Sequence, residues 1–148
     1  MLTEEAWLEE LALDECLRLL RSQAVGRVAV AQEGAPIVLP VNYRLVEAVD
    51  TWVAVRTRPG SILDGAPLGA ALEVDQIDPG HREGWSVLVR GTLLHVDPDA
   101  VEFRERFDPE PWLSEERDSW LVLEPFAITG RRLHAAESDW AFHLRAYL

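Results

Sequence analysis

A change of period after residue 22 sets the fold class of this chain. Before it, apolar residues recur at helical spacing; after it, they come in short runs rich in valine and isoleucine, separated by turn residues. Such runs are typical of β-strands joined by short turns. The chain is therefore expected to be mainly β, with a helix near its N-terminus.

The N-terminal segment has the pattern of an amphipathic helix. Thr3 is a suitable N-cap and is followed by Glu4 and Glu5, which the helix dipole favours in a first turn. The periodic apolar positions are Leu8, Leu11, Ala12, Cys16, Leu19 and Leu20. The pattern fits one helix to about Ser22, or two segments broken at Leu13–Asp14, with Asp14 capping the second. Cys16, the only cysteine, is interpreted as a buried apolar residue.

The rest of the chain reads as about six strands. They are expected at 25–31, 37–46, 51–57, 70–74, 85–96 and, as a final strand or strand pair, 120–134. A short helical turn is expected at 62–65 and a helix at 98–107, and Pro40 indicates an edge or a bulge. Sequential strands with short turns predict a six-stranded antiparallel barrel, and residues 1–148 are expected to form a single domain.

Charge and composition exclude several functions. The net charge is −12, and the longest basic cluster is Arg131–Arg132, so nucleic acid is not an expected partner. Because no apolar run approaches the ~20 residues of a membrane helix and the N-terminus is acidic, we expect a cytoplasmic protein without a membrane span. All 14 basic residues are arginine, which excludes a pyridoxal-phosphate lysine and a Walker lysine. Any bound phosphate must be held by arginine, hydroxyls or backbone amides.

Metal and hydrolytic sites are not indicated by the sequence. The histidines have no ligand spacing, and the nearest pattern, Asp75, Asp78 and His81, is interpreted as solvated loop residues. Ser61 and Ser86 lie in no nucleophile elbow. No metal is therefore expected, and no catalytic residue is identified.

Three segments are unusual for a plain barrel. The first segment has a proline inside a strand and the only asparagine of the chain; its residues are Pro40, Val41, Asn42 and Tyr43. This combination suits binding of the polar rim of a flat heterocycle, or simply a bulged edge strand. The second suits a phosphate, or a solvated corner, and includes Arg56, Thr57, Arg58 and Ser61. The third begins with Trp85 and Ser86 after a glycine, and Trp85 fits a ligand, an interface or the core.

Taken together and in this order, the segments resemble the FMN-binding split-barrel family of pyridoxamine 5'-phosphate oxidase-like proteins, and most closely its short, nitroimidazole-resistance-like branch. The resemblance runs from about residue 13 to 133. The matching segments are 25–29, 40–43, 56–57 with 60–61, 73–75, 84–87 with 89–91, and 128–132.

The resemblance implies a homodimer with two FMN sites at the subunit interface. Pro40 to Tyr43 would then line the isoalloxazine, and Arg56, Thr57, Arg58 and Ser61 would hold the phosphate. Trp85 and Ser86 would touch the flavin near the dimer seam. Segment 140–148 is apolar and is expected to pack on the body of the chain or on a second subunit. The implied function is an FMN-dependent oxidoreductase acting on an unknown small molecule.

The sequence departs from the family at Ile62. The family commonly has a lysine there that meets the FMN phosphate, and a charged hydrogen bond contributes about 1.5–3 kcal/mol. The helix that follows is also shortened, to residues 63–67. Two alternatives stay open: a non-catalytic protein that binds a flavin, a deazaflavin or heme, and a split barrel that has lost FMN and binds another ligand.

Overall fold

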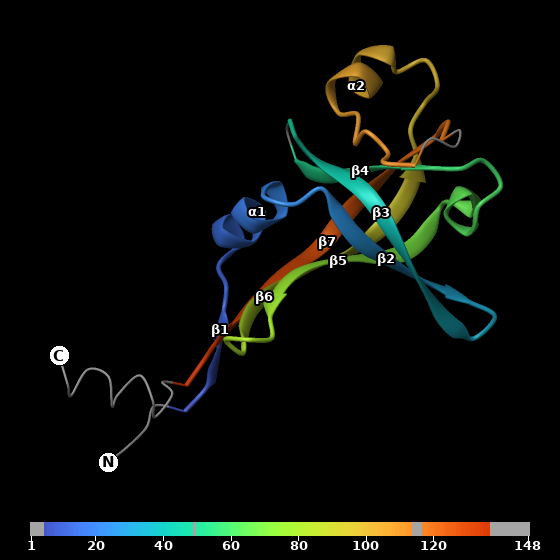
Figure 1. Cartoon of the computed structure of the whole chain (residues 1–148). Helices are drawn as coiled ribbons and strands as arrows, with labels where there is room; N and C mark the ends of the chain where they lie inside the picture. Colours follow the sequence, from blue (N-terminus) through green and yellow to red (C-terminus); the bar gives the residue numbers. More distant parts are fainter. Residues whose placement is uncertain (1–4, 49, 114–116, 137–148) are drawn as a thin grey trace, which may run out of the picture.

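The computed structural model of the chain describes residues 5–48, 50–113 and 117–136. Its strands are β1 (Trp7–Glu10), β2 (Val25–Gln32), β3 (Ala35–Glu47), β4 (Thr51–Thr57), β5 (Leu68–Asp78), β6 (Glu83–His95) and β7 (Ser119–His134). The helical elements are α1 (Leu13–Arg21), the short 3-10 turn η1 (Ile62–Gly65) and α2 (Val101–Arg106). The predicted mainly-β fold is confirmed (Figure 1).

Six of the strands close into a ring. In the order β7-β4-β3-β2-β5-β6 each strand pairs antiparallel with the next, and β6 pairs back onto β7. This confirms the predicted six-stranded antiparallel barrel. A further strand, β1, pairs with the last residues of β7, at the end of the barrel opposite α2 (Figure 1).

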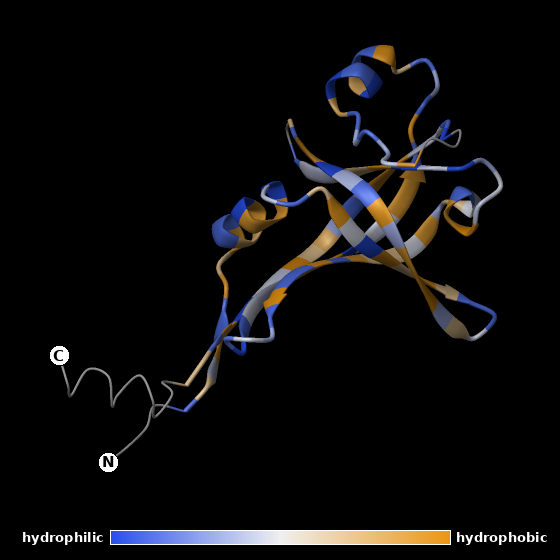
Figure 2. Ribbon diagram, in the orientation of Figure 1, coloured by the Kyte–Doolittle hydropathy of each residue, from blue (hydrophilic) through white to orange (hydrophobic). Residues whose placement is uncertain are grey.

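Alternation along the strands builds the core of the barrel. The register aligns Val28 of β2 with Leu72 of β5, and Leu72 with Val89 of β6, so the three side chains share one level of the interior. All three have 0% exposure. The colours of Figure 2 follow the same alternation along the strands. Burial of a side chain of this size contributes about 1.5–3 kcal/mol, which explains why the short runs of valine and leucine specify the barrel.

Helix α1 packs on the barrel through its apolar stripe. Cys16, Leu19 and Leu20 are its buried residues, which confirms the interpretation of Cys16. Gly130 of β7 gives room for this contact, since a Cβ there would lie 2.6 Å from the Cys16 Sγ. The Tyr43 hydroxyl donates a 2.5 Å hydrogen bond to the carbonyl of Leu20, which ties the end of α1 to β3.

The prediction of helix before residue 13 is wrong. Residues 7–10 form β1, because they pair with residues 131–134 of β7 and because the Trp7 ring stacks on His134 at 4.1 Å. Tertiary pairing thus overrides the helical spacing of Leu8, which is 59% exposed. The helix that does form begins at Leu13, close to the predicted second segment. Its N-cap is Ala12 rather than the predicted Asp14, which lies in the first turn with Glu15. The proposed cap, Thr3, lies outside the described residues.

Strand β7 is one continuous strand rather than a pair. Its pairing with β6 has a β-bulge at Arg90/Gly91, and Phe126 is the residue of β7 that β6 leaves without a partner there. The backbones approach closely at this point: a Cβ on Gly91 would lie 2.0 Å from the Glu124 carbonyl oxygen. Only glycine fits such an approach, and bulges of this kind help a sheet to close.

Within the described residues, neither helix has the length and apolarity needed to cross a membrane. The segment 140–148, which the sequence predicted to pack on the body or on a second subunit, lies outside the described residues.

Candidate functional site

A cavity of about 360 Å³ opens where strands β3 and β4 separate. The ladder between them runs from Glu47↔Thr51 to Tyr43↔Val55 and stops there. Beyond it β3 pairs only with β2, and β4 continues along β7, so the facing edges of 39–42 and 56–57 are unpaired with each other. Pro40 lies on that open edge, which confirms the predicted edge position. The lining residues are Leu39, Pro40, Val41, Asn42, Arg56, Thr57, Arg58, Ser61, Leu63, Pro111, Leu113 and Arg117.

This cavity brings together two of the three segments that the sequence singled out. Seven of the predicted site residues line it: Pro40, Val41, Asn42, Arg56, Thr57, Arg58 and Ser61. The apolar and amide residues come from β3, and the arginines and hydroxyls come from the end of β4 and the loop after it. One side is therefore suited to a flat ring and the other to an anion.

Asn42 has a donor group without a partner. The backbone N–H of Trp112 donates to the Asn42 Oδ1 at 3.0 Å, which fixes the orientation of the amide. The Asn42 Nδ2 is buried and has no hydrogen-bond partner among the described residues. A buried donor left in this state costs about 1–3 kcal/mol.

Arg56 is held on three sides. Its Nη1 lies 3.0 Å from the Asp108 Oδ1, and its Nε donates to the carbonyl of Arg117 at 3.0 Å. The guanidinium also lies over the Trp120 ring, 4.7 Å from the centroid. The side chain is 19% exposed, Asp108 is its counter-ion, and Arg56 is one of the residues that line the cavity.

Polar groups of the loop after β4 form hydrogen bonds with one another. The Thr57 and Ser61 hydroxyl oxygens are 2.6 Å apart, and the Gly60 N–H donates to the Asp64 carboxylate at 2.9 Å. The Ser119 hydroxyl donates to the other Asp64 oxygen. These bonds, first that of Gly60, lower the pKa of Asp64. The Asp64 carboxylate thus occupies the backbone amide of Gly60, and Ile62 in the same loop is 36% exposed.

Three predicted site residues lie elsewhere in the chain. Tyr43 is 4% exposed, and burial raises the pKa of its hydroxyl; its ring lines a separate hollow with Leu20 and Arg21. Trp85 lines a cavity of about 550 Å³ between the β5–β6 hairpin and β7, with Arg132. Ser86 lies between Asp75 and Arg131 in the sheet. One chain therefore does not bring Trp85 and Ser86 to the cavity at β3 and β4.

The segment between α2 and β7 also lines the cavity, and the sequence did not predict its contribution. Asp108, Pro111, Leu113 and Arg117 come from this segment and complete the cavity or hold its arginine. The composition around 107–113, with two prolines and a tryptophan, gives no information on which part of the barrel this segment covers. Long-range placement of a loop depends on tertiary contacts that local sequence does not encode.

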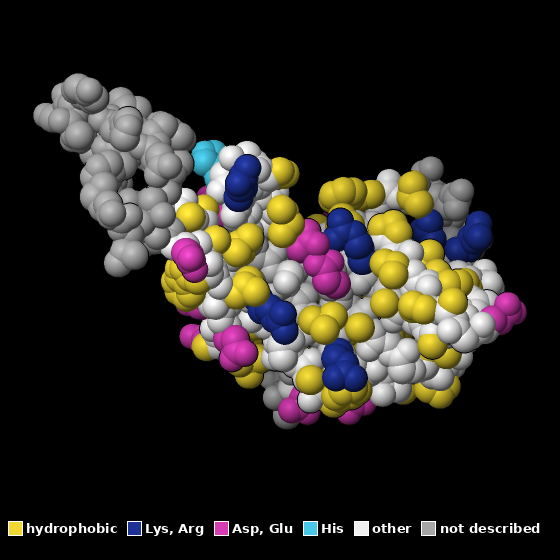
Figure 3. Space-filling view, turned by 90° about the horizontal axis from the view of Figure 1, so that it is seen from below, with side chains coloured by type: hydrophobic (Ala, Val, Ile, Leu, Met, Phe, Trp, Pro, Cys, Tyr) yellow, Lys and Arg dark blue, Asp and Glu magenta, His cyan; other side chains and the backbone are white. Residues whose placement is uncertain are grey.

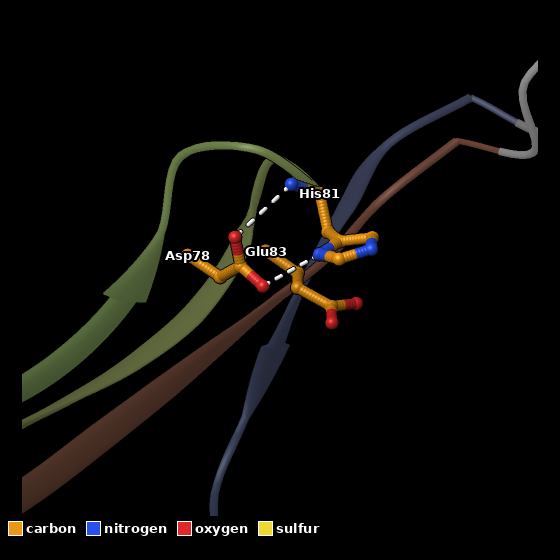
Figure 4. A group of neighbouring side chains, drawn as sticks. All are labelled: Asp78, His81 and Glu83. Carbon is orange, nitrogen blue, oxygen red and sulfur yellow. Dashed lines mark hydrogen bonds and ion pairs between the residues drawn. The ribbon is translucent and has the colours of Figure 1, made fainter.

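The hairpin between β5 and β6 carries the one group of possible metal ligands found in the described residues (Figure 4). Ligand atoms of Asp78, His81 and Glu83 lie within 4.8 Å of one another, and all three side chains are exposed. The Asp78 carboxylate accepts from the His81 backbone N–H at 3.2 Å and contacts its Nδ1 at 2.6 Å. This contact raises the pKa of His81. Both oxygens of Asp78 thus serve the turn, and we assign the group to the structure of the hairpin.

The outer face of β2 and β5 carries paired charges. Arg27 contacts Glu73 at 3.1 Å and Asp75 at 3.0 Å. Burial, and then the neighbouring Asp75, raise the pKa of Glu73 to about 7. Figure 3 shows arginine and carboxylate side chains interspersed among hydrophobic ones on one face of the molecule. On the described part of that face, charges of one sign do not gather into an extended patch.

Comparison with known proteins gives consistent matches. The family model of pyridoxamine 5'-phosphate oxidase matches residues 12–132. An uncharacterized protein of Mycobacterium tuberculosis, Rv0080, is 37% identical over 134 residues, covering 85% of this chain and 86% of that protein. The FAD-binding protein from Mycobacterium smegmatis is 28% identical with a TM-score of 0.64, covering 86% of this chain and 100% of that one. A candidate 5-nitroimidazole antibiotic resistance protein from Bacteroides thetaiotaomicron, 11% identical with a TM-score of 0.65 over 93% of this chain and 98% of that one, shares the fold.

Proposed function

We propose that this chain, which belongs to the pyridoxamine 5'-phosphate oxidase family, is an oxidoreductase that binds its flavin cofactor in the cavity between β3 and β4. The family confirms the resemblance inferred from the sequence. The proposal is supported by the position of seven predicted site residues around one cavity, and by the solved FAD-binding protein that shares 28% identity with this chain.

The unpaired Asn42 Nδ2 is the single observation that carries the proposal. A flavin ring has carbonyl and ring-nitrogen acceptors along one edge, and such an acceptor satisfies the donor that the protein leaves unpaired. Pro40 and Val41 provide apolar surface beside it on the same strand. The residues present therefore fit the polar edge of a flavin.

The other side of the cavity fits the phosphate of a flavin nucleotide. Arg56 and Arg58 supply charge. The hydroxyl pair of Thr57 and Ser61 supplies one further O–H donor, because the other O–H lies in the bond between them. A bound flavin supplies hydride or electron transfer, while the protein supplies position and electrostatics. In this account Asn42 orients the ring and the arginines fix its anionic end, and the open face of the cavity receives an unknown small molecule.

FMN is the form of flavin that we propose, and FAD is the closest competitor. The cavity of about 360 Å³ lies within the range of small-ligand sites, and arginines are among the residues that line it. FMN ends in one phosphate, whereas FAD extends through a second phosphate to adenosine. Competition between FMN and FAD for the purified protein distinguishes the two directly.

We also propose that the site is completed in a homodimer. Trp85 and Ser86 lie outside the cavity of one chain, so their expected contact with the flavin requires a second copy. Mixed dimers test this arrangement. A chain carrying W85A and a chain carrying N42L are each expected to lose flavin as homodimers, whereas the mixed dimer regains one intact site. Flavin binding by W85A alone at wild-type affinity would contradict the shared site.

The proposal is tested by the visible spectrum of the purified protein, recorded with added FMN or FAD after free dye has been filtered out. Retained flavin near one per chain, reduced by a nicotinamide donor faster than free flavin, is the expected result. Retained flavin without such reduction would support a carrier rather than an enzyme. A protein that releases all added flavin would contradict the proposal.

The second candidate is a split barrel that binds another ligand without FMN. It is favoured by Ile62 in place of the family's lysine and by the Asp64 carboxylate on the Gly60 amide. The I62K variant tests it, because a cation at this exposed position would strengthen FMN binding about tenfold or more if the phosphate lies beside it. A wild-type protein that retains no FMN, together with an I62K variant that does retain it, would favour the second candidate.

A further inference from the structure

The anion side of the cavity contains a built-in competitor for its arginine. Asp108 contacts the Arg56 Nη1 with both carboxylate oxygens, at 3.0 and 3.4 Å. Asp108 thus holds Nη1 while the Arg117 carbonyl holds Nε, so a phosphate that approaches Arg56 on the Nη1 side must compete with the carboxylate. Because Arg56 lines the cavity, the charge available to a ligand depends on whether Asp108 keeps this contact.

The structure holds Asp108 in this position. The adjacent Pro109 is buried, and the Glu110 N–H donates to the Asp108 Oδ1 at 3.0 Å with Glu110 at a φ of 37°. Arg56 is fixed as well, by the Arg117 carbonyl and by the Trp120 ring. Neither Arg56 nor Asp108 can therefore move away without breaking other contacts, so the ion pair is part of the ligand-free site.

We propose that Asp108 is a specificity-determining residue that competes with the ligand's phosphate for Arg56. This inference deepens the proposed function and rests on it for the identity of the ligand. A doubly charged phosphate approaching Arg56 is repelled by the carboxylate at hydrogen-bond distance from the same guanidinium. The carboxylate therefore lowers affinity for FMN while leaving the affinity for riboflavin, which carries no phosphate, nearly unchanged.

The experiment compares D108N with E110Q. D108N removes the charge and keeps an oxygen that can accept from the Glu110 N–H. E110Q removes one negative charge from the same segment, but the Glu110 side chain is exposed, and the contact described for this residue is made by its backbone N–H. The expected result is that D108N binds FMN at least tenfold more tightly than wild type, whereas E110Q changes FMN affinity less than twofold. Riboflavin affinity is expected to change less than twofold in both variants.

A second measurement is independent of flavin. Inorganic pyrophosphate is expected to raise the melting temperature of D108N more than that of wild type or E110Q. If no variant binds any flavin but this difference appears, the proposed function fails and the competition stands. If D108N binds neither FMN nor pyrophosphate more tightly than E110Q, the competition is overturned. Weaker FMN binding by D108N would also overturn it, because Asp108 would then orient Arg56 for the ligand. Should D108N fail to fold, D108S keeps an acceptor for the turn and is measured in the same way.

Discussion

Replacing Asn42 by leucine tests whether this residue serves ligand binding or the stability of the fold. Leucine has a similar branched shape but no donor, so N42L removes the buried Nδ2 that has no partner and also the Oδ1 that accepts from Trp112. The first change stabilises the ligand-free protein and the second costs about 0.5–1.5 kcal/mol. We therefore expect the free energy of unfolding to change by about 1 kcal/mol or less, which is a shift of about 4 °C or less in melting temperature.

Flavin affinity is expected to fall much more than stability. If a flavin acceptor pairs with the Asn42 Nδ2, losing the donor costs about 1–3 kcal/mol of binding, which corresponds to a roughly 5- to 150-fold weaker affinity. Equilibrium dialysis of FMN and thermal unfolding of the ligand-free protein give the two quantities. N42D is the companion variant: it keeps the acceptor for Trp112, and in place of the Nδ2 donor it puts a carboxylate oxygen with a negative charge, so it should lose flavin as well. Wild-type affinity in N42L, or a loss of stability as large as the loss of affinity, would refute the reasoning.

Three further substitutions test the fold and its charges. G91A is expected to cost about 3 kcal/mol or more, since its Cβ would lie 2.0 Å from a backbone oxygen of β7; G69A, with nothing within 4 Å, should change stability by less than about 0.5 kcal/mol in the same denaturant titration. Y43F is expected to cost about 1–3 kcal/mol in thermal unfolding, because the carbonyl of Leu20 loses its short hydrogen bond and keeps only the Gln23 N–H at 3.5 Å. In the folded protein the pKa of Glu73 is about 7, above the ordinary 4.5. Between pH 4.5 and 7 the folded protein therefore holds a proton that the unfolded chain has released, so the free energy of unfolding falls as the pH rises through this range. E73Q should reduce this fall by up to about 1 kcal/mol, since the group is partly solvated, and identical pH profiles for the two proteins would contradict the assignment.

The barrel was predictable because its strands carry local signals. Runs such as Val28–Val30 combine β-branched residues with alternation, and turn residues separate them, so strand existence and order follow from the sequence. The strand β1 was not predictable, since Trp7–Glu10 has helical spacing and becomes a strand only through its pairing with β7. The bulge that joins the two predicted halves of β7 is likewise set by the approach to Gly91.

The candidate site was predictable in part, for the same reason. Residues 40–42 and 56–61 are unusual by themselves, and the sequence placed them on or next to two consecutive strands. The structure adds that the ladder between these strands ends before it reaches either segment. The sequence did not show that the polar groups of the second segment already have internal partners. Asp64 and Asp108 supply these partners from positions 4 and 52 residues away from Gly60 and Arg56, and only the folded chain brings them together.

The central claim is that a flavin pairs with the side chain of Asn42. Asn42 is the only asparagine in the chain, so selective ¹⁵Nδ2-asparagine labelling gives a single pair of side-chain amide signals in an NMR spectrum. We predict that adding FMN shifts both signals and that the shift persists after free dye has been removed. Signals that stay in place while flavin is retained would put the flavin elsewhere in the protein, and signals that stay in place because no flavin is retained would contradict flavin binding itself.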